Sequence, residues 1–339
     1  MSRIARRIRM GSRSCPSPGE GALRAEQHFL DTALRGRAAR KVRAHLRRME
    51  PVVLLTPRWG SAPGFLEDLS LDLAVGEPSV GCRTVDLSPL QGRSSGECWQ
   101  FLHHALAQLG QRGWRRSAPT SVVDRRGFRW TLEQTLAEVH DSAPHRVALL
   151  AHGADHLPID VIEDLTTVWE AYTARNPAGR RITLLLSGSR AAHWLSIGDA
   201  PQVDLADFCE SEAAAAIVGR AGPLPLRHLA EVARFTGGIP SLVEAVGGSA
   251  RREGTLPVRR EELIGSMGRL ADEMRGAVDI VAASDHLADR LHALLDGDSA
   301  TMEPEVDVPL VRAGLLRELR VTGSPQVALR APAIAALLG

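Results

Sequence analysis

Lysine is almost absent from this chain. Among the 41 basic residues of the 339-residue sequence, Lys41 is the single lysine and all the others are arginine. Any chemistry that requires a lysine at another position is therefore excluded. The 40 acidic residues nearly balance the basic ones and leave a formal charge of +1, so no overall field attracts nucleic acid or an acidic membrane.

Cysteine pairs and long apolar runs are missing as well. Cys15, Cys82, Cys98 and Cys209 are scattered, without a CxxC pair or paired histidine spacing, which argues against a zinc site or a disulfide framework. No apolar run reaches the length of a membrane span, and the first residues lack the apolar core of a secretory signal. We therefore expect a cytoplasmic protein without membrane association or bound metal.

What the chain does contain is a series of short apolar runs that alternate with helical patterns between residues 51 and 203. The predicted strands are Val52–Leu55, Cys82–Leu87, Val147–Leu150 and Ile182–Leu186. Uninterrupted apolar strands separated by helices are typical of a parallel sheet covered on both faces. The pattern predicts an α/β core of the P-loop NTPase type, with three layers.

The flanking segments have other patterns. Residues 1–21 mix arginine with Ser, Pro and Gly and predict a disordered basic N-terminus. Residues 22–50 predict a basic helix, either packed beside the first strand with a solvated charged face or, less favoured, an arm that binds nucleic acid or a partner. Residues 204–252 predict an all-helical lid, and residues 253–339 predict a winged-helix-like domain with helices followed by a β-hairpin.

The turn after the first strand is laid out as a phosphate-binding loop but lacks its chemistry. Such a loop uses glycines to curl backbone N–H groups around phosphate, a lysine for the β- and γ-phosphates, and a hydroxyl for Mg²⁺. In the segment 56–63, Ala62 occupies the place of the lysine and Pro63 that of the hydroxyl residue. The sequence thus predicts a degenerate loop.

The end of the third predicted strand shows a second loss. A nucleotide hydrolase places an Asp for Mg²⁺ and a Glu for water activation at this point, whereas this chain has His152 and Gly153. Asp155 is predicted to cap the helix that follows Pro158, with a rescued metal site as the less favoured alternative. His103, His104, His152 and His156 are of the residue type that binds metals, but their context predicts no metal site.

Two further motifs follow. The fourth predicted strand ends in Ser187-Gly188-Ser189, where a polar residue commonly senses the γ-phosphate, although Ser189 as a helix cap explains the same letters. The turn Thr236–Pro240 contains two glycines and a proline that suit a sharp corner between helices.

The order of these pieces resembles the STAND and origin-recognition-like branch of the AAA+ ATPases, from about residue 50 to the C-terminus. The segment Val311–Leu316 is similar to a conserved stretch of that family's winged helix. The resemblance implies ATP bound between core and lid, with the Gly-Gly-x-Pro turn reading its state. It implies a degenerate nucleotide site at Arg58, Gly60, Ser61, Ser187, Ser189, Gly237, Gly238 and Pro240.

The predicted function is that of a catalytically inactive ATPase-fold protein acting as a regulatory adaptor or scaffold through protein–protein interaction. The lost lysine and carboxylates remove about 4–6 kcal/mol of binding, which leaves roughly millimolar ATP affinity. A weak ATP-binding switch without hydrolysis is the first alternative, and a winged-helix DNA-binding protein is the second. The sequence predicts protein partners and no cofactor, and it leaves homo-oligomerisation open; some relatives in the family serve bacterial defence.

Overall fold

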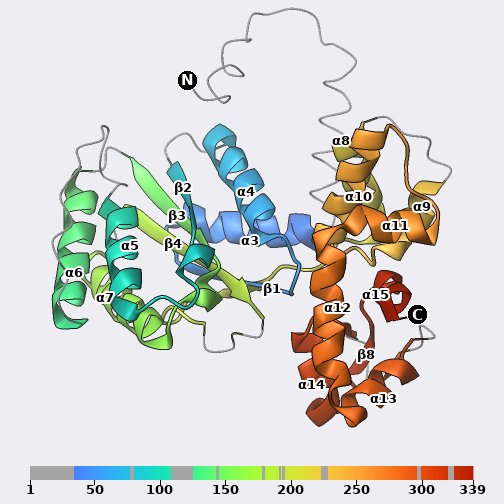
Figure 1. The fold of residues 1–339 in the computed structure, drawn as a ribbon. Coiled ribbons are helices and arrows are strands. Elements are labelled where there is room, and N and C mark those ends of the chain that lie inside the picture. The colour runs from blue at the N-terminus through green and yellow to red at the C-terminus, as the bar shows by residue number, and fades with distance from the viewer. Residues whose placement is uncertain are drawn as a thin grey trace, which may run out of the picture.

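The computed structural model describes residues 34–76, 80–107, 125–142, 145–177, 180–190, 192, 195–222, 228–295, 299–319 and 324–338. The predicted disordered segment 1–21 and the first part of the predicted helix 22–50 lie outside the described residues. Figure 1 shows an α/β part joined to a helical part that carries a small second sheet.

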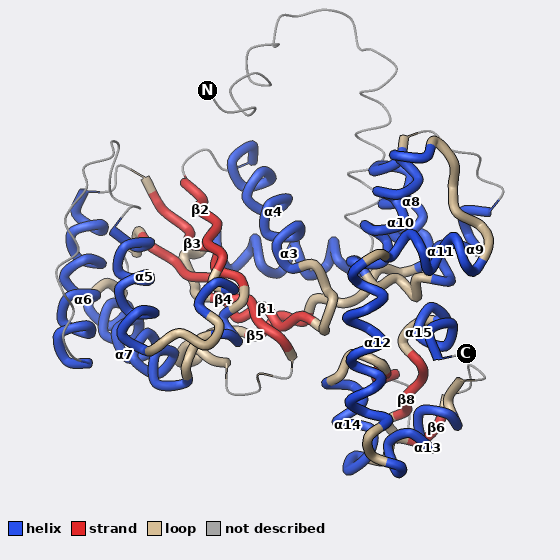
Figure 2. Tube along the Cα trace, in the orientation of Figure 1, coloured by secondary structure: helices blue, strands red, loops and turns tan. Residues whose placement is uncertain are grey.

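A five-stranded parallel sheet forms the centre of the α/β part, in the order β2-β3-β4-β1-β5 (Figure 2). Its strands are β1 (Val52–Thr56), β2 (Val80–Asp86), β3 (Arg146–His152), β4 (Ile182–Ser189) and β5 (Gln202–Asp204). Consecutive residues Val52, Val53 and Leu54 are fully buried. Because neighbouring side chains point to opposite faces of a strand, this burial means that both faces are covered. The predicted parallel α/β sheet is confirmed.

Two separate cores cover these faces. The helices are α3 (Leu34–Arg47) and α4 (Ala62–Gly76) on one side, and α5 (Ser95–Ala107), α6 (Arg125–Ser142) and α7 (Ile159–Arg175) on the other. Val52 and Leu54 pack with α3 and α4, whereas Val53 and Leu149 pack with α5, α6 and α7. The alternation along β1 produces the three predicted layers.

Helix α3 packs its apolar stripe onto the sheet. Ala38, Val42 and Leu46 recur at every fourth position and are buried, while Arg37 and Arg40 are exposed. Over α3, the interpretation of a solvated basic face beside the first strand is confirmed. Arg35, at the start of the helix, is buried and is described with the site.

The helical part begins with α8 (Glu210–Ala221), α9 (Leu229–Phe235), α10 (Pro240–Glu253) and α11 (Arg260–Met267), which share one core. Pro240 occupies the first turn of α10, as expected, where its missing N–H costs no hydrogen bond.

A further core, separate from that of α8–α11, forms the third part of the molecule, which we call the C-terminal part. It is built from α12 (Arg269–Ala282), α13 (Asp285–Ala293), β6 (Ala300–Thr301), α14 (Pro304–Arg312), β7 (Leu316–Leu319), β8 (Gln326–Leu329) and α15 (Pro332–Leu338). The three strands form an antiparallel sheet in the order β6-β8-β7. The predicted hairpin is present as β7 and β8, and β6 adds a strand that the sequence did not indicate.

Helices α11 and α12 are separated at Gly268, whose φ of 52° is left-handed and ends the first helix before the second begins. Two local interpretations were wrong. Asp155 lies in a short 3-10 turn and does not cap α7, whose N-cap is Pro158. Ser189 is the last residue of β4 and does not open a helix. Within the described part of the chain, every helix is too short or too polar to cross a membrane.

Candidate functional site

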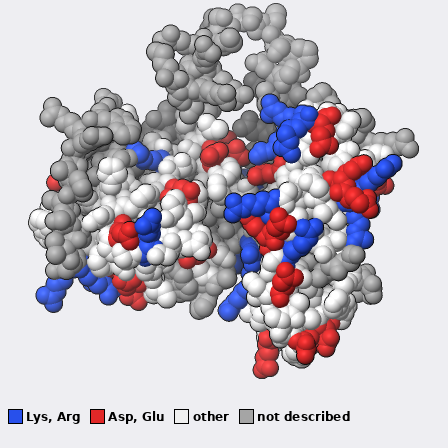
Figure 3. All heavy atoms as spheres, viewed as in Figure 1, with Lys and Arg blue, Asp and Glu red and all other residues white. Residues whose placement is uncertain are grey.

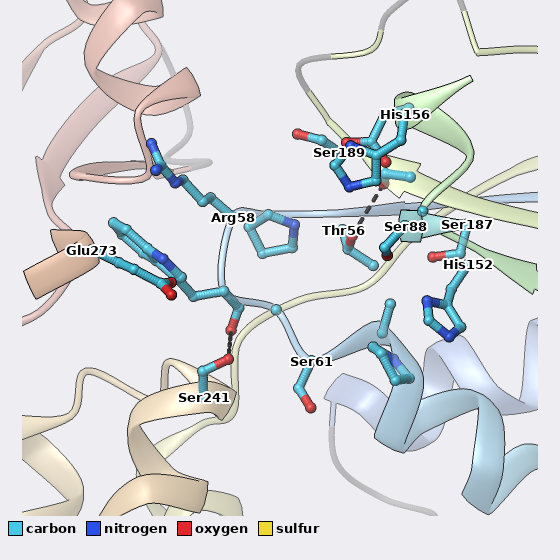
Figure 4. Close-up of a pocket in the computed structure, with 18 of the residues that line it drawn as sticks. Thr56, Arg58, Ser61, Ser88, His152, His156, Ser187, Ser189, Ser241 and Glu273 are labelled. Carbon is cyan, nitrogen blue, oxygen red and sulfur yellow. Dashed lines mark hydrogen bonds between the residues drawn. The ribbon is translucent and has the colours of Figure 1, made fainter. Parts of the chain in front are cut away.

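The carboxyl ends of the central strands meet at one edge of the sheet. Asp86 pairs in register with His152, and His152 pairs with Ser187; Thr56 pairs with Ser189. A cavity of about 690 Å³ opens above this edge (Figure 4). Its lining comes from the loop after β1, the strand ends, Ser241 of α10, Glu273 of α12 and Arg312 of α14. The α/β part, the α8–α11 helices and the C-terminal part therefore all contribute residues.

The loop after β1 adopts an unusual backbone. Trp59 and Ser61 have φ values of 60° and 50°, in the left-handed region that non-glycine residues rarely occupy. Gly60 donates its N–H to the Pro57 carbonyl at 2.9 Å, and a Cβ at Gly60 would lie 2.7 Å from that same oxygen. Successive turns of this kind form concavities of backbone N–H groups that suit anions.

Helix α4 begins directly after the loop. The Ser61 carbonyl accepts the first helical bond, from Phe65 N–H at 3.3 Å. Ala62, in the place of the expected lysine, is the first residue of the helix and lines the cavity with Pro63. The first N–H groups of a helix have no partner within it and carry a partial positive charge. The loop after β1 and the start of α4 therefore border the cavity, with Ala62 in the place where the sequence comparison expects a lysine.

Side chains from three elements hold the carbonyl groups of this loop. Arg330 Nη1 donates to the Arg58 carbonyl at 2.6 Å, and Ser241 Oγ donates to the Trp59 carbonyl at 2.9 Å (Figure 4). Arg35 Nη2 donates to the Gly60 carbonyl. Since C=O and N–H point in opposite directions across a trans peptide, these bonds turn the N–H groups of Trp59 and Ser61 away from the two arginines.

Arg35 is a functional residue that the sequence did not single out. Its guanidinium stacks on the Phe208 ring at 4.5 Å from the centroid and also donates to the Ala206 carbonyl at 3.2 Å. Burial lowers the pKa of Arg35 to about 10, against the attraction of nearby carboxylates including Asp207 and Glu212, so the side chain stays charged at neutral pH. In the sequence Arg35 stands among other arginines, so nothing in the pattern indicated that its side chain is buried.

Arg330 is a second such residue. It is 2% exposed, and its Nε and Nη2 donate to both carboxylate oxygens of Asp207 at 2.8 and 2.7 Å. With its bond to the Arg58 carbonyl, it links the C-terminal part, the segment before α8 and the phosphate loop. Trp59 packs against the C-terminal core, and a Cβ at Gly314 would lie 2.9 Å from its ring. The C-terminal part thus packs directly against the loop.

The backbone at the place of a water-activating glutamate disfavours any residue other than glycine. Gly153 has a φ of 76°, and a Cβ there would lie 2.8 Å from Ser88 Oγ. His152 is nearly buried, with Nδ1 3.4 Å from an oxygen of Asp86. Burial alone would raise the pKa of Asp86, but hydrogen bonds from Ser88 and the charges of His152 and His156 bring it below its usual value.

The predicted sensor residues both line the cavity. Ser187 is fully buried and its Oγ has no hydrogen-bond partner, which is uncommon because buried hydroxyls are nearly always paired. Ser189 lies at the end of the same strand. Among the loop candidates, Arg58, Gly60 and Ser61 line the cavity too.

The glycine turn lies elsewhere. Gly237, Gly238 and Pro240 are not among the lining residues, although the neighbouring Ser241 is. Gly237 and Gly238 have φ values of 58° and 74°. Their Cβ positions would fall 2.4 Å from the Arg330 carbonyl and 1.9 Å from the Phe208 carbonyl. The two glycines pack closely against Arg330, which binds the Arg58 carbonyl of the loop, and against Phe208, on which Arg35 stacks.

Comparison with known proteins gives the fold and nothing finer. No protein-family model matches the chain, and no curated protein does. A Walker-type ATPase of Pyrococcus abyssi matches with a TM-score of 0.61 at 13% identity, covering 90% of this chain and 95% of that one. The chain therefore has a P-loop NTPase-like fold.

Two further solved structures score lower. Cdc6p from Pyrobaculum aerophilum matches with a TM-score of 0.48 at 12% identity, over 90% of this chain and 93% of that one. A STAND protein with a tetratricopeptide-repeat sensor from Pyrococcus horikoshii scores 0.42 at 11% identity, over 88% of this chain and 41% of that one. Similarity at this level carries no functional argument.

Proposed function

We propose that this chain is a degenerate AAA+ protein of the STAND-like branch that does not hydrolyse ATP and works as an adaptor or scaffold through contacts with other proteins. The observation that carries the proposal is the phosphate loop. It keeps its curled backbone, is held at three carbonyl groups by Arg35, Ser241 and Arg330, and has no lysine.

The chemistry of phosphoryl transfer supports the inactive part. Catalysis of that reaction depends on positioning and on charge stabilisation by a lysine, a metal ion and a carboxylate that orients water. Here Ala62, His152 and Gly153 occupy those places, and the positive φ of Gly153 disfavours a glutamate there. Arg58 does not replace the lysine, because its guanidinium turns over the Trp59 ring, 4.9 Å from the centroid.

The arrangement of the parts supports the scaffold role. In ATP-driven relatives a bound nucleotide sits between the core and the lid, as the family resemblance implies. In this chain, Arg330 and Ser241 join the core loop to the C-terminal part and to α10 through hydrogen bonds between protein groups. Side-chain contacts that hold the parts together suit a protein that presents surfaces to partners.

An assay of phosphate release from ATP tests the inactive part. We expect no release above buffer for the purified chain with Mg²⁺, nor for the variants Arg58→Ala and His152→Ala. Turnover that persists through purification and disappears in either variant would overturn the proposal.

The DNA-binding alternative is tested beside it. On the face shown in Figure 3, basic and acidic side chains are interspersed over the helical part, which disfavours a phosphate-binding stripe. A gel-shift titration on duplex DNA at rising salt decides: binding that weakens steeply with salt would favour DNA over protein partners.

A further inference from the structure

Helix α4 turns an acidic and apolar face away from the sheet. The side chains of this outer face recur at helical spacing and are exposed: Glu67, Asp68, Leu71, Ala74 and Val75. Leu71 is 59% exposed and Val75 85%, whereas Leu66, Leu69 and Leu73 on the opposite face are buried. Because exposed apolar surface rimmed by charge often marks a site of interaction, the outer face of α4 is a candidate docking surface.

The carboxylates of the outer face lack countercharges. Within the described ranges, neither Glu67 nor Asp68 forms a hydrogen bond or ion pair, whereas Asp72 on the flank of the helix is 3.4 Å from Arg43. Partial burial raises the pKa of Asp68, and the charges of Asp72 and Glu67 raise it further, against the opposing effect of Arg35. The outer face therefore carries uncompensated negative charge.

The described chain begins beside this helix. Arg35, in the first turn of α3, donates to the Gly60 carbonyl and lies 5.9 Å from the centre of the Phe65 ring, in the first turn of α4. Both helices pack on the same side of the sheet (Figure 1). Residues 1–33 therefore join the described structure next to the start of α4.

The distances allow this preceding segment to reach the outer face. Val75 lies ten residues beyond Phe65 along α4, which is about 15 Å at the rise of an α-helix. A flexible connection of the length of residues 14–33 spans about 25 Å. Residues 1–13 are therefore within reach of the whole outer face.

The chemistry of residues 1–13 complements this face. Five arginines and no acidic residue occur there: Arg3, Arg6, Arg7, Arg9 and Arg13. Guanidinium groups bind carboxylates through paired hydrogen bonds. Ile4 and Ile8 add two large apolar side chains four positions apart, which is also the spacing of Leu71 and Val75. The segment thus supplies the cations and the apolar partners that the outer face lacks.

We propose that residues 1–13 dock on the outer face of α4 in the same chain, with arginines against Glu67 and Asp68 and isoleucines against Leu71 and Val75. Attachment to the same chain gives the segment an effective concentration of about a millimolar, so weak contacts suffice. A partner with basic and apolar side chains then competes with the chain's own segment for this face. The docking is independent of the proposed function; only its consequence for partners rests on that function.

Disulfide capture in the full-length chain tests the docking. Ala5→Cys places a thiol between the two isoleucines and is combined with Cys15→Ser, so that it is the only thiol in residues 1–33. Ala74→Cys places the second thiol on the outer face. In the matched control, Gln134→Cys places it at an exposed position of α6, on the other side of the sheet.

The rate of linkage is the readout. At low salt we expect Ala74→Cys to link to Ala5→Cys about tenfold faster than Gln134→Cys does, because docking raises the local thiol concentration above that given by the tether. At about 1 M salt the excess should shrink severalfold, since charges are then screened beyond about 3 Å. The cysteines of the folded core stay in place, and mass spectrometry identifies the linked peptides.

Charge reversal separates a specific surface from a general charge effect. Glu67→Arg/Asp68→Arg should reduce the rate of linkage at Ala74→Cys to that of the control. Glu261→Arg/Asp279→Arg changes the net charge equally at exposed positions of α11 and α12 and should leave the rate unchanged. All four carboxylates are exposed, and thermal unfolding followed by circular dichroism checks that the variants fold.

A charge swap gives the sharpest result. Arg6→Glu/Arg7→Glu alone should slow the linkage, because it places carboxylates against carboxylates. Combined with Glu67→Arg/Asp68→Arg, it should restore much of the wild-type rate. A restored rate requires that the two segments face each other.

Three results would contradict the docking. They are equal rates at Ala74→Cys and Gln134→Cys, a rate that Glu67→Arg/Asp68→Arg leaves unchanged, and linkage that joins two chains and rises with protein concentration. The last would make a second copy of the chain the occupant. Because no nucleotide enters these measurements, ATP turnover would contradict the proposed function and leave this inference standing.

Discussion

Two arginines of the C-terminal part, Arg330 and Arg290, each bind both carboxylate oxygens of an aspartate, and the chemistry of the two pairs is nearly the same. Arg330 binds both oxygens of Asp207 at 2.8 and 2.7 Å and donates to the Arg58 carbonyl. Arg290 binds both oxygens of Asp307 at 2.9 Å and donates to the Thr301 carbonyl at 2.7 Å. The first pair joins three parts of the molecule, whereas the second lies within one.

The difference lies in where the partners come from and how deeply they are buried. The Asp307 side chain is fully buried, and Asp207 is 18% exposed. Equal hydrogen bonding therefore serves two purposes: Arg290 stabilises the C-terminal fold, while Arg330 fixes that fold against the phosphate loop. Breaking each pair in turn separates the stability of a part from the arrangement of the parts.

Arg290→Met should have the largest effect. It leaves Asp307 buried without its cation, which typically costs 3–5 kcal/mol, because an unpaired charge in the interior cannot be solvated. We expect loss of about that amount from the unfolding free energy in urea titrations. The double variant Arg290→Met/Asp307→Leu is the control and should recover much of the loss. A single variant of wild-type stability would show that the pair contributes nothing.

Arg330→Met should cost less stability and change the shape more. Asp207 is partly solvated when its partner is removed, so we expect a loss of about 2 kcal/mol. The C-terminal part should separate from the loop, which small-angle scattering would detect as a larger radius of gyration. Arg290→Met, measured under native conditions, should leave the radius of the folded molecules unchanged. If the two variants give the same radius, the joint does not depend on Arg330.

Acid should have the smallest effect of the three changes, and it should act through the Arg290–Asp307 pair. Burial alone would raise the pKa of Asp307, but hydrogen bonds from Arg290 and the Glu303 N–H outweigh it and lower the pKa below the usual value. A carboxyl with a lowered folded pKa contributes stability above its unfolded pKa of about 3.9, and this is lost as the pH falls through the folded pKa.

We therefore expect the unfolding free energy to fall at this site as the pH drops from about 5 through the folded pKa of Asp307. Asp307→Asn should lack this part of the acid dependence in urea titrations at each pH, and Asp207→Asn should keep it. An Asp307→Asn curve parallel to the wild type would place the acid loss elsewhere.

Much of the fold was predictable because its signals are local. The apolar runs at 52–55, 147–150 and 182–186 marked strands covered on both faces, and all three form the parallel sheet. β5 and β6 were missed because three and two residues are too short to form a recognisable pattern.

The candidate site was predictable only where a residue lies at or shortly after the end of a strand. Ser61 and Ser187 could be placed at the sheet edge by counting from β1 and β4, and both line the cavity. Arg35 and Arg330 could not be found, since all but one of the chain's 41 basic residues are arginine and burial depends on partners far along the chain. Arg330 lies 272 positions from the carbonyl that it binds.

The sequence by itself determined that a lysine is absent from the loop at Ala62, that a histidine and a glycine stand at the end of β3, and that the segments 52–55, 147–150 and 182–186 are covered on both faces. These are properties of residue identity and short-range periodicity. The same prediction for 82–87 was wrong, because β2 is an edge strand with a largely exposed face. Only the tertiary structure decided that Gly153 has a left-handed φ, that the Ser187 hydroxyl is unpaired, and that two arginines hold the phosphate loop. Those facts depend on backbone angles and on contacts between distant segments, which a linear pattern does not encode.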